Sequence, residues 1–531
     1  MGGDAPAIVA ELERRGVHPV FVLDEGGAIV EKVFPGVDQP AALIGIAEKG
    51  SAFLDLTAVG KGGHASAPPA RQSVGVLARA LDRIARRPMP FVMTIAILLV
   101  VGGILSALPA SNHFFAREGF FAVGLIWLVT GVMGALPFYF SGTFPSFVDC
   151  LFESVSGFTT TGATILTDIE SLPKGILLWR AFTHWLGGMG ILVLATALLP
   201  SMGVRSHYLA QAESPGPVFS KLVPKQSQTS KILYSIYCVM TAVEVALLKL
   251  AGMPFYDALV HAFSTAGTGG FSNRAASVGA YDSAVIDLII GVFCLLFSIN
   301  FALYFLVLQR RIWEALKSDE LRFFLVVVAL ATAAIAVDIL PQYGSILQSL
   351  RYSFFQVASI ISTTGFATAD FSQWPELSKM ILLLLMVVGA CAGSTGGGIK
   401  VIRLEILLKS LARDVKRTIH PRGVKVVKSE GRAVDDPTIN SITVFFFSYI
   451  FIILMATLLV SLDGLSFETS FTATVSALGN IGPGLDKVGP MGNFSCFSPF
   501  SKIVLCLCML AGRLEIYPIL MLVTPATWKK A

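Results

Sequence analysis

The chain has 531 residues, of which 54% are hydrophobic and only 14% are charged, and its formal net charge is +5. Its mean hydropathy is +0.72. A soluble protein of this length could not solvate so much apolar surface, so the composition excludes that class and predicts an integral membrane protein. The seven cysteines lie mostly within apolar runs, which is typical of packing and not of a disulfide or zinc framework.

The first 88 residues have the mixed helix-and-strand pattern of a small α/β unit. Within them, "VFVLDEGGAIV" and "GKGGHASAPP" resemble the zinc-dependent aminoacylase/carboxypeptidase family. The resemblance implies Asp24 as a metal ligand and His64 as the histidine of that family's second domain. One carboxylate cannot hold a catalytic zinc, which needs about three protein ligands. We therefore predict that residues 1–88 are a truncated, inactive peptidase-like fragment without a zinc site.

An extra apolar helix follows within residues 89–112, and its apolar core is residues 91–109. The three arginines before it, Arg83, Arg86 and Arg87, place its start in the cytoplasm by the positive-inside rule. A single full crossing ahead of the first repeat would instead place the fragment outside. Whether residues 91–109 cross the membrane fully, and on which side the fragment lies, stay open at this stage.

Long apolar stretches alternate with short, more polar segments over the rest of the chain. Stretches long enough to span a bilayer lie near 91–109, 119–140, 176–200, 232–251, 284–308, 323–340, 379–395, 442–461 and 502–524. Segments too short to span lie near 148–159, 257–267, 353–363 and 467–478, and each runs into a glycine. The pattern predicts four repeats of helix, re-entrant segment and helix, covering 113–205, 206–310, 311–437 and 438–531.

The glycines that we align between the repeats are Gly162, Gly270, Gly365 and Gly479. Non-helical backbone at membrane depth is tolerated only where protein buries it or where it lines water. Four such turns around one axis can direct their carbonyl groups at a dehydrated monovalent cation. Small residues also serve as helix-packing contacts, but four copies at equivalent positions favour a pore. The expected fold is an all-α membrane protein with four pseudo-symmetric repeats around one pore, plus the α/β fragment.

Basic residues gather in the loops on the side opposite the re-entrant segments. They include Arg310, Arg311, Lys317 and Arg322, and the run "KSLARDVKRTIHPRGVKVVK". The positive-inside rule places these loops in the cytoplasm, so the re-entrant segments enter from outside. The basic 404–437 loop is also long enough to dock a cytosolic partner.

Several motifs resemble the TrkH/KtrB superfamily of potassium transporters: "LFESVSGFTTTGATIL", "WLGGMGILVLATALLP", "STTGFATADFSQWP", "CAGSTGGGIKVIR" and "GNIGPGL". The match runs from about Arg117 to the C-terminus. It implies potassium uptake by a multi-pass protein of the bacterial inner membrane that is no enzyme. It also implies a homodimer within membrane lipid, gated by a cytosolic nucleotide-binding regulator of the TrkA/KtrA kind. We expect no cofactor in this chain, K⁺ as the transported ion, and no nucleic acid partner.

The resemblance also assigns site residues. The implied K⁺ selectivity filter comprises Thr160, Thr161, Gly162, Thr268, Gly269, Gly270, Thr363, Thr364, Gly365, Leu478, Gly479 and Asn480. The implied intramembrane gate loop comprises Gly393, Ser394, Thr395, Gly396, Gly397, Gly398 and Lys400, with Arg513 beside it. From the residues alone, so many glycines in 389–400 interrupt a helix, since each costs about 1 kcal/mol relative to alanine.

Charged residues within apolar runs need a partner or water. We expect Arg513, in the middle of an apolar run, to face the pore. Lys400 and Arg403 are expected to extend their charged ends to the inner membrane surface. Two other functions stay open from the sequence: a sodium- and potassium-permeable channel without a regulator, and a bifunctional membrane-anchored hydrolase.

Overall fold

The computed structural model describes residues 21–23, 27–30, 41–42, 56–57, 89–107, 116–190, 226–420 and 426–524. The chain divides into two compact units, Met1–Met93 and Thr94–Ala531, and each is described by itself. In the first unit, strands β1 (Phe21–Leu23), β2 (Gly27–Val30), β3 (Ala41–Ala42) and β4 (Leu56–Thr57) form one antiparallel sheet in chain order. Asp24 and His64, which the peptidase resemblance singles out, lie outside the described residues.

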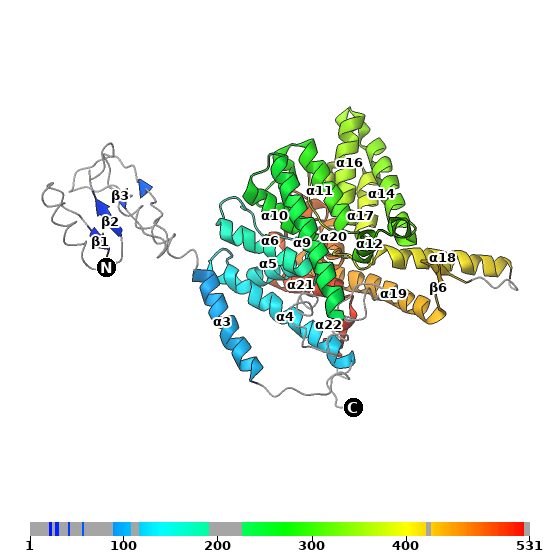
Figure 1. Ribbon diagram of the computed structural model, residues 1–531, viewed down its shortest axis with the longest axis horizontal. Helices are drawn as coiled ribbons and strands as arrows, with labels where there is room; N and C mark the ends of the chain where they lie inside the picture. Colours follow the sequence, from blue (N-terminus) through cyan, green and yellow to red (C-terminus); the bar gives the residue numbers. More distant parts are fainter. Residues whose placement is uncertain are drawn as a thin grey trace. The chain divides into compact units, whose positions relative to one another are not determined.

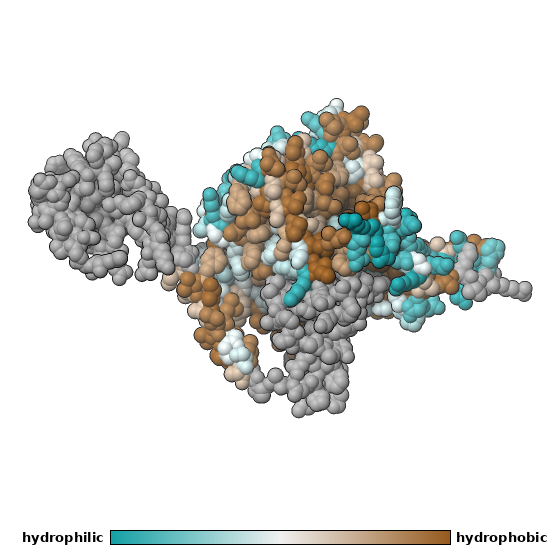
Figure 2. Space-filling view, viewed as in Figure 1, coloured by the Kyte–Doolittle hydropathy of each residue, from teal (hydrophilic) through white to brown (hydrophobic). Residues whose placement is uncertain are grey.

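Five helices among the described residues are long and apolar enough to cross a membrane. They are α3 (Met89–Ser106), α4 (Ala116–Phe140), α9 (Gln226–Leu250), α14 (Asp319–Asp338) and α19 (Asp436–Val460). Apolar side chains cover the visible face over α9, α11 (Ala284–Phe297) and α16 (Ile346–Ile361) (Figure 2). Hydrophilic side chains gather near α12 (Phe301–Leu308) and along α18 (Val401–Ile419). The fold is therefore that of an all-α, multi-pass membrane protein, as the composition predicts.

Four short helices stand where the sequence predicts re-entrant segments: α5 (Phe147–Phe158), α10 (Phe255–Ala266), α16 (Ile346–Ile361) and α20 (Phe467–Gly479). At 1.5 Å per residue they fall well short of a hydrocarbon core about 30 Å thick. The Ser146 hydroxyl caps α5 by accepting from the Asp149 N–H at 3.2 Å, and Ser466 caps α20 through the Thr469 N–H at 3.1 Å. These N-caps fix where α5 and α20 begin.

Among the described residues, the second helix is interrupted in the second, third and fourth repeats; in the first repeat, α6 (Lys174–Gly188) is described to its end at Gly188. In the second repeat, α11 (Ala284–Phe297) meets α12 (Phe301–Leu308) at a bend of 94°. α17 (Glu376–Val388) is separated from α18 (Val401–Ile419), and α21 (Pro499–Arg513) from α22 (Tyr517–Val523). The sequence predicts such an interruption only in the third repeat, and the structure adds those within the apolar stretches 284–308 and 502–524.

The break between α11 and α12 is stabilised by a side-chain cap and by hydrogen bonds from a distant loop. The Asn300 side chain caps α12 by accepting from the Ala302 N–H at 2.9 Å. The carbonyls that the break frees are bonded by the loop after α17: Cys391 N–H donates to Ser298 O at 3.1 Å, and Thr395 N–H to Phe297 O at 3.3 Å. Backbone polar groups at membrane depth are thus satisfied within the protein.

Contacts between helices close the repeats into a ring, and these helices are labelled in Figure 1. Within a repeat, the short helix packs against the helices before and after it, as α16 does against α14 and α17. Between repeats, the second helix of one packs on the short helix of the next, through α6 with α10, α11 with α16, α17 with α20, and α21 with α5. The last pair joins the fourth repeat to the first, so the four short helices surround one axis.

The remaining described elements are short. They are helices α13 (Ile312–Ala315) and α15 (Leu340–Tyr343), the hairpin β5 (Lys428–Ser429) and β6 (Arg432–Ala433), and the 3₁₀ turns η2 (Ser277–Tyr281), η3 (Phe371–Gln373), η4 (Ser461–Asp463), η5 (Asp486–Val488) and η6 (Phe494–Cys496). The hairpin connects α18 to α19, and these two helices pack together.

Candidate ion pathway

The chain takes the same backbone path after each of the four short helices. One residue adopts a left-handed conformation, and a glycine with positive φ follows two positions later. The pairs, with their φ angles, are Thr160 (56°) and Gly162 (79°), Thr268 (55°) and Gly270 (75°), Thr363 (60°) and Gly365 (81°), and Asn480 (55°) and Gly482 (102°). Left-handed conformations are unfavourable for residues with a Cβ, so four copies indicate a geometry that the surroundings enforce.

The four glycines lie against backbone carbonyls of the next repeat. A Cβ atom built on Gly162 would lie 1.8 Å from the Gly269 oxygen, one on Gly270 2.1 Å from the Thr364 oxygen, one on Gly365 2.0 Å from the Ile481 oxygen, and one on Gly482 2.8 Å from the Thr161 oxygen. The contacts run around the ring and return to the first repeat. The segments that end at these glycines therefore meet at one axis, and a side chain does not fit between them.

The fourth repeat corrects the alignment made from the sequence. Gly479 is the last residue of α20 and, with Leu478, lies within the helix. A Cβ atom on Gly479 would meet Ile481 Cδ1 at 2.7 Å and Met386 O at 3.1 Å, neither of them in a neighbouring turn of the ring. Gly482 occupies the position equivalent to Gly162, and Ile481 that of Thr161. Asn480 keeps its predicted place among the residues of the four turns, at the position equivalent to Thr160.

A serine six residues before each ring glycine identifies the correct register. These serines are Ser156, Ser264, Ser359 and Ser476. The residue just before each glycine donates its N–H to the carbonyl of that serine, at 2.9 Å from Thr161, 2.8 Å from Gly269, 2.9 Å from Thr364 and 3.0 Å from Ile481. The spacing is visible in the sequence, and alignment on the serine would have selected Gly482.

All four ring glycines line one cavity of about 140 Å³. Residues of the segment after α20, including Pro483, Met491 and Phe494, also line it, as do Arg180 and Arg274. We call this cavity the outer mouth. Because it touches each repeat, it marks the point where the four turns converge.

A buried ion pair bonds to the segment that follows the turn of the first repeat. Arg180 Nε lies 2.7 Å from Glu153 Oε1, and both side chains are almost fully buried. The same carboxylate accepts from the Thr164 hydroxyl at 2.9 Å and from the Ile165 N–H at 3.2 Å. Arg180 also donates to Ser272 O, in the second repeat, at 3.3 Å. Extra hydrogen bonds of this kind are what allow a buried charge pair to be retained.

On the other side of the ring, residues 389–400 form an irregular loop that lies directly under the turns of the third and fourth repeats. The Gly397 N–H donates to Thr363 Oγ1 at 2.7 Å. A Cβ atom on Gly397 would lie 2.4 Å from Gly479 O, and one on Gly396 would lie 2.9 Å from Ser362 O. The loop glycines are thus needed for close approach to the turns, as well as for the break in the helix.

Arg513, the last residue of α21, joins this loop to the first repeat. Its guanidinium donates to Thr395 O at 2.7 Å, to Gly188 O at 2.6 Å, and to Thr160 Oγ1 at 3.3 Å. The Arg513 guanidinium therefore contacts three segments next to the ring: the loop, the end of α6 and the turn after α5.

The chain resembles known proteins over most of its length. A family model described as a cation transport protein, TrkH, matches residues 88–530. The Trk system potassium uptake protein TrkH of Salmonella typhimurium is 40% identical over 449 residues, covering 83% of this chain and 92% of that protein. The TrkG protein of Escherichia coli is 34% identical over 449 residues, covering 83% and 91%.

The chain belongs to the TrkH family. A crystal structure of the potassium transporter TrkH from Vibrio parahaemolyticus matches the fold with a TM-score of 0.74 at 36% identity, covering 86% of this chain and 96% of that one. With these bacterial relatives and the spans described above, this TrkH-family chain is a multi-pass protein of the inner membrane.

Two basic side chains at the end of the loop are buried, whereas the sequence predicts that they reach the membrane surface. Lys400 and Arg403 are only 2% and 6% exposed. Lys400 Nζ donates back to Gly396 O, and Arg403 pairs with Glu515 and donates to Ile399 O at 3.0 Å. The expectation that both extend to the inner surface is wrong, because carbonyls of the loop and one carboxylate solvate them within the protein. In this TrkH-family chain they hold the lower end of the loop.

Proposed function

We propose that this protein takes up potassium across the inner membrane, by conducting K⁺ through the ring of four turns. The relatives are named as Trk system potassium uptake proteins, and the chain covers nearly their whole length. In this proposal the carbonyls before Gly162, Gly270, Gly365 and Gly482 replace the hydration shell of the ion. The threonines and Asn480 at the left-handed positions complete the lower end of the filter.

The observation that carries the proposal is the cyclic contact of each ring glycine with a carbonyl of the next repeat. Four carbonyl-bearing turns at one axis concentrate partial negative charge, which attracts a cation and repels an anion. The outer mouth opens onto the same four glycines. The ring therefore has an entrance for the ion on its outer side.

The proposal is tested with the purified protein in vesicles, by measuring flux of K⁺, Rb⁺ and Na⁺. We expect K⁺ and Rb⁺ to permeate far better than Na⁺. Gly162→Ser should weaken this discrimination, because its φ of 79° and the carbonyl 1.8 Å from a Cβ atom leave no space for a side chain. A permeability ratio equal to that of the unaltered protein would remove the first repeat from the filter.

We assign the gate to the 389–400 loop together with Arg513. The loop lies under the ring, and a positive charge at this level opposes the passage of a cation through a medium of low dielectric constant. Opening then requires the loop to leave its contacts with Thr363 and Arg513. Because glycines permit many backbone conformations, this segment can move without melting the helices on either side.

We infer that a cytosolic nucleotide-binding subunit of the TrkA/KtrA kind moves the gate and that the protein acts as a homodimer, since membrane subunits of Trk systems are this chain's relatives. Flux measured with and without such a subunit tests the first inference, and the mass of the purified protein tests the second. Equal flux in both conditions would favour an unregulated cation channel.

A further inference from the structure

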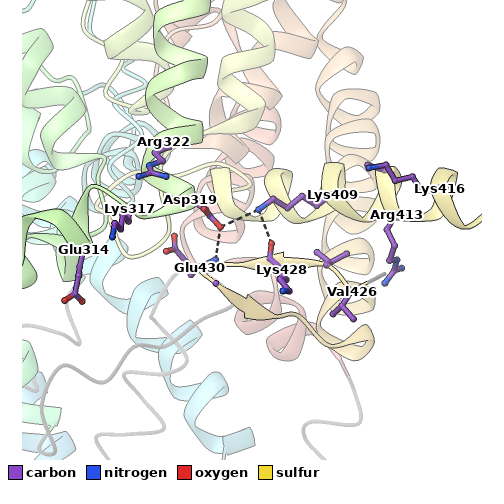
Figure 3. A pocket seen from close by; sticks show the side chains of 13 residues that line it. Glu314, Lys317, Asp319, Arg322, Lys409, Arg413, Lys416, Val426, Lys428 and Glu430 are labelled. Carbon is purple, nitrogen blue, oxygen red and sulfur yellow. Dashed lines mark hydrogen bonds and ion pairs between the residues drawn. The ribbon is translucent and has the colours of Figure 1, made fainter. Parts of the chain in front are cut away.

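A groove of about 960 Å³ opens on the face that the basic loops assign to the cytoplasm. It lies between the α13–α14 turn, α18 and the β5–β6 hairpin (Figure 3). Among the residues that the structure describes, six basic side chains line the groove, against three acidic ones. The basic residues are Lys317, Arg322, Lys409, Arg413, Lys416 and Lys428.

The acidic side chains of the groove are already engaged. Glu314 pairs with Arg311, and Asp319 lies 3.6 Å from Lys409 Nζ. Glu430, at the tip of the hairpin, is bonded to the start of α14. The groove therefore has no free carboxylate among the described residues that could neutralise the other cations.

Four basic side chains among the described residues keep their charge unpaired by a carboxylate, although Arg322 also donates from Nε to Leu316 O at 2.9 Å. Among the described residues, no carboxylate oxygen lies within 4.0 Å of the charged groups of Lys317, Arg322, Lys416 or Lys428, and all four are exposed. They come from three different elements that face one opening (Figure 3). These positive charges line one groove and attract an anion, and a phosphate group is a common anionic partner of lysine and arginine side chains.

The surroundings of the groove favour a lipid head group over a dissolved anion. Arg322 lies in the first turn of α14, which spans the membrane, so the groove lies at the level of the membrane surface. Beside it, α13 presents exposed apolar side chains: Trp313 is 78% exposed, Ile312 50% and the adjoining Leu316 47%. Aromatic side chains concentrate at this level of a membrane, where acyl chains can cover them. Basic pockets at the cytoplasmic ends of spans bind anionic lipid head groups.

Hydrogen bonds connect the groove to the 389–400 loop. Glu430 Oε1 accepts from Ser318 Oγ at 2.7 Å and from the Glu320 N–H at 3.2 Å. Glu320 in turn accepts from the Ala392 N–H, within the loop, at 2.7 Å. On the other wall, Lys409 donates to Lys428 O at 3.0 Å. The hairpin, the start of α14 and the loop are thus linked by direct contacts, which a ligand drawing the walls together would displace.

We propose that this groove binds the phosphate of an anionic lipid head group, and that the bound lipid biases the position of the 389–400 loop. The binding site stands on the groove alone. The effect on the loop rests on the proposed function, in which that loop is the gate.

Binding is measured on the purified full-length protein by native mass spectrometry with phosphatidylglycerol or phosphatidylcholine. We expect phosphatidylglycerol to be retained preferentially. The double variant Lys317→Gln with Lys428→Gln should lower its affinity about twenty-five-fold, because each basic side chain near an anionic surface contributes roughly a factor of five. The matched control is Lys231→Gln with Arg417→Gln, which removes two exposed cytoplasmic charges outside the groove and should change affinity less than threefold. Equal losses in both double variants would overturn the site.

Flux measurements test the proposed effect of the bound lipid on the 389–400 loop. In vesicles without a regulator, K⁺ flux should change when phosphatidylglycerol is added, and the Lys317/Lys428 variant should lose this response. Glu430→Ala should keep lipid retention but also lose the response, because its side chain connects the hairpin to α14. Flux that is absent in every lipid refutes the proposed function and leaves the retention result standing. Retention without any effect of lipid on flux overturns the link to the loop.

Two further outcomes identify a different occupant. Inorganic phosphate that displaces the lipid and alone restores the flux response would show a site for a dissolved anion. A Lys317/Lys428 variant that retains lipid normally but no longer responds to a nucleotide-binding subunit would show a docking site for that subunit. Either result overturns the lipid proposal.

Discussion

Gly482 and Gly479 lie three residues apart, and only Gly482 has the backbone of a ring glycine. Gly482→Ala would place a Cβ atom 2.8 Å from Thr161 O at a φ of 102°. Such strain amounts to roughly 1–3 kcal/mol. We expect the ratio of K⁺ to Na⁺ permeability to fall about tenfold, as measured by reversal potentials or by competing flux in vesicles.

Gly479→Ala is the matched comparison. Its Cβ atom would be crowded by Ile481 and Met386, so we expect a lower yield of folded protein with an unchanged permeability ratio. Helix interiors prefer alanine to glycine, which offsets part of the crowding. Loss of selectivity in Gly479→Ala but not in Gly482→Ala would restore the alignment made from the sequence.

Arg513 offers a way to separate charge from hydrogen bonding. Arg513→Gln removes a positive charge below the ring and should raise K⁺ flux without a regulator about tenfold. Arg513→Lys keeps the charge but loses most of the bonds to Thr395, Gly188 and Thr160. Single-turnover or tracer flux in vesicles distinguishes the two variants.

If repulsion by the charge is the barrier, Arg513→Lys stays as slow as the unaltered protein. If the guanidinium mainly holds the loop, both variants conduct faster. No change in either variant would return Arg513 to a packing role.

Gly396 and Gly397 make the contacts of the 389–400 loop with the turns of the third and fourth repeats. Deletion of Gly396 and Gly397 takes away the hydrogen bond to Thr363 Oγ1 and the close approach to Gly479 O and Ser362 O. We expect regulator-independent flux to rise several-fold, while the order of permeability among K⁺, Rb⁺ and Na⁺ stays the same. The unchanged order is the internal control, because a damaged filter would alter it.

The breaks in the second helices show what an apolar pattern leaves out. Hydropathy depends on side chains, whereas the bend between α11 and α12 depends on backbone groups of the loop that bond to Phe297 O and Ser298 O. These partners are about a hundred residues away in the chain. A window of sequence around 284–308 therefore reads as one continuous span.

The proposed ion pathway lies in the second compact unit. The ring, the outer mouth and the loop all lie within residues 116–524. Deleting residues 1–88 should therefore leave potassium uptake within about twofold of the full-length protein, because the deletion removes none of these contacts. The measurement is growth of potassium-uptake-deficient cells at low K⁺, normalised to the amount of protein in the membrane.

A truncated protein that inserts normally but no longer transports would show that the N-terminal unit takes part in transport. Poor insertion alone would show only that it assists biogenesis. The two results are separated by quantifying the protein in the membrane fraction.

The sequence alone was sufficient to predict a membrane protein with fourfold repeats, from its composition, its apolar periodicity and its four glycine-ended segments. Bilayer thickness, and the need to hydrogen-bond every backbone polar group within the protein, restrict what such segments can form. The sequence also placed the interruption in 389–400, since glycine weakens a helix locally. These signals did not identify Gly482 as the ring glycine of the fourth repeat. They also did not predict the breaks after α11 and α21 or the burial of Lys400 and Arg403. Each depends on backbone carbonyls or a carboxylate, such as that of Glu515, supplied by a segment distant in the chain. Such partners meet only when the repeats close around their common axis.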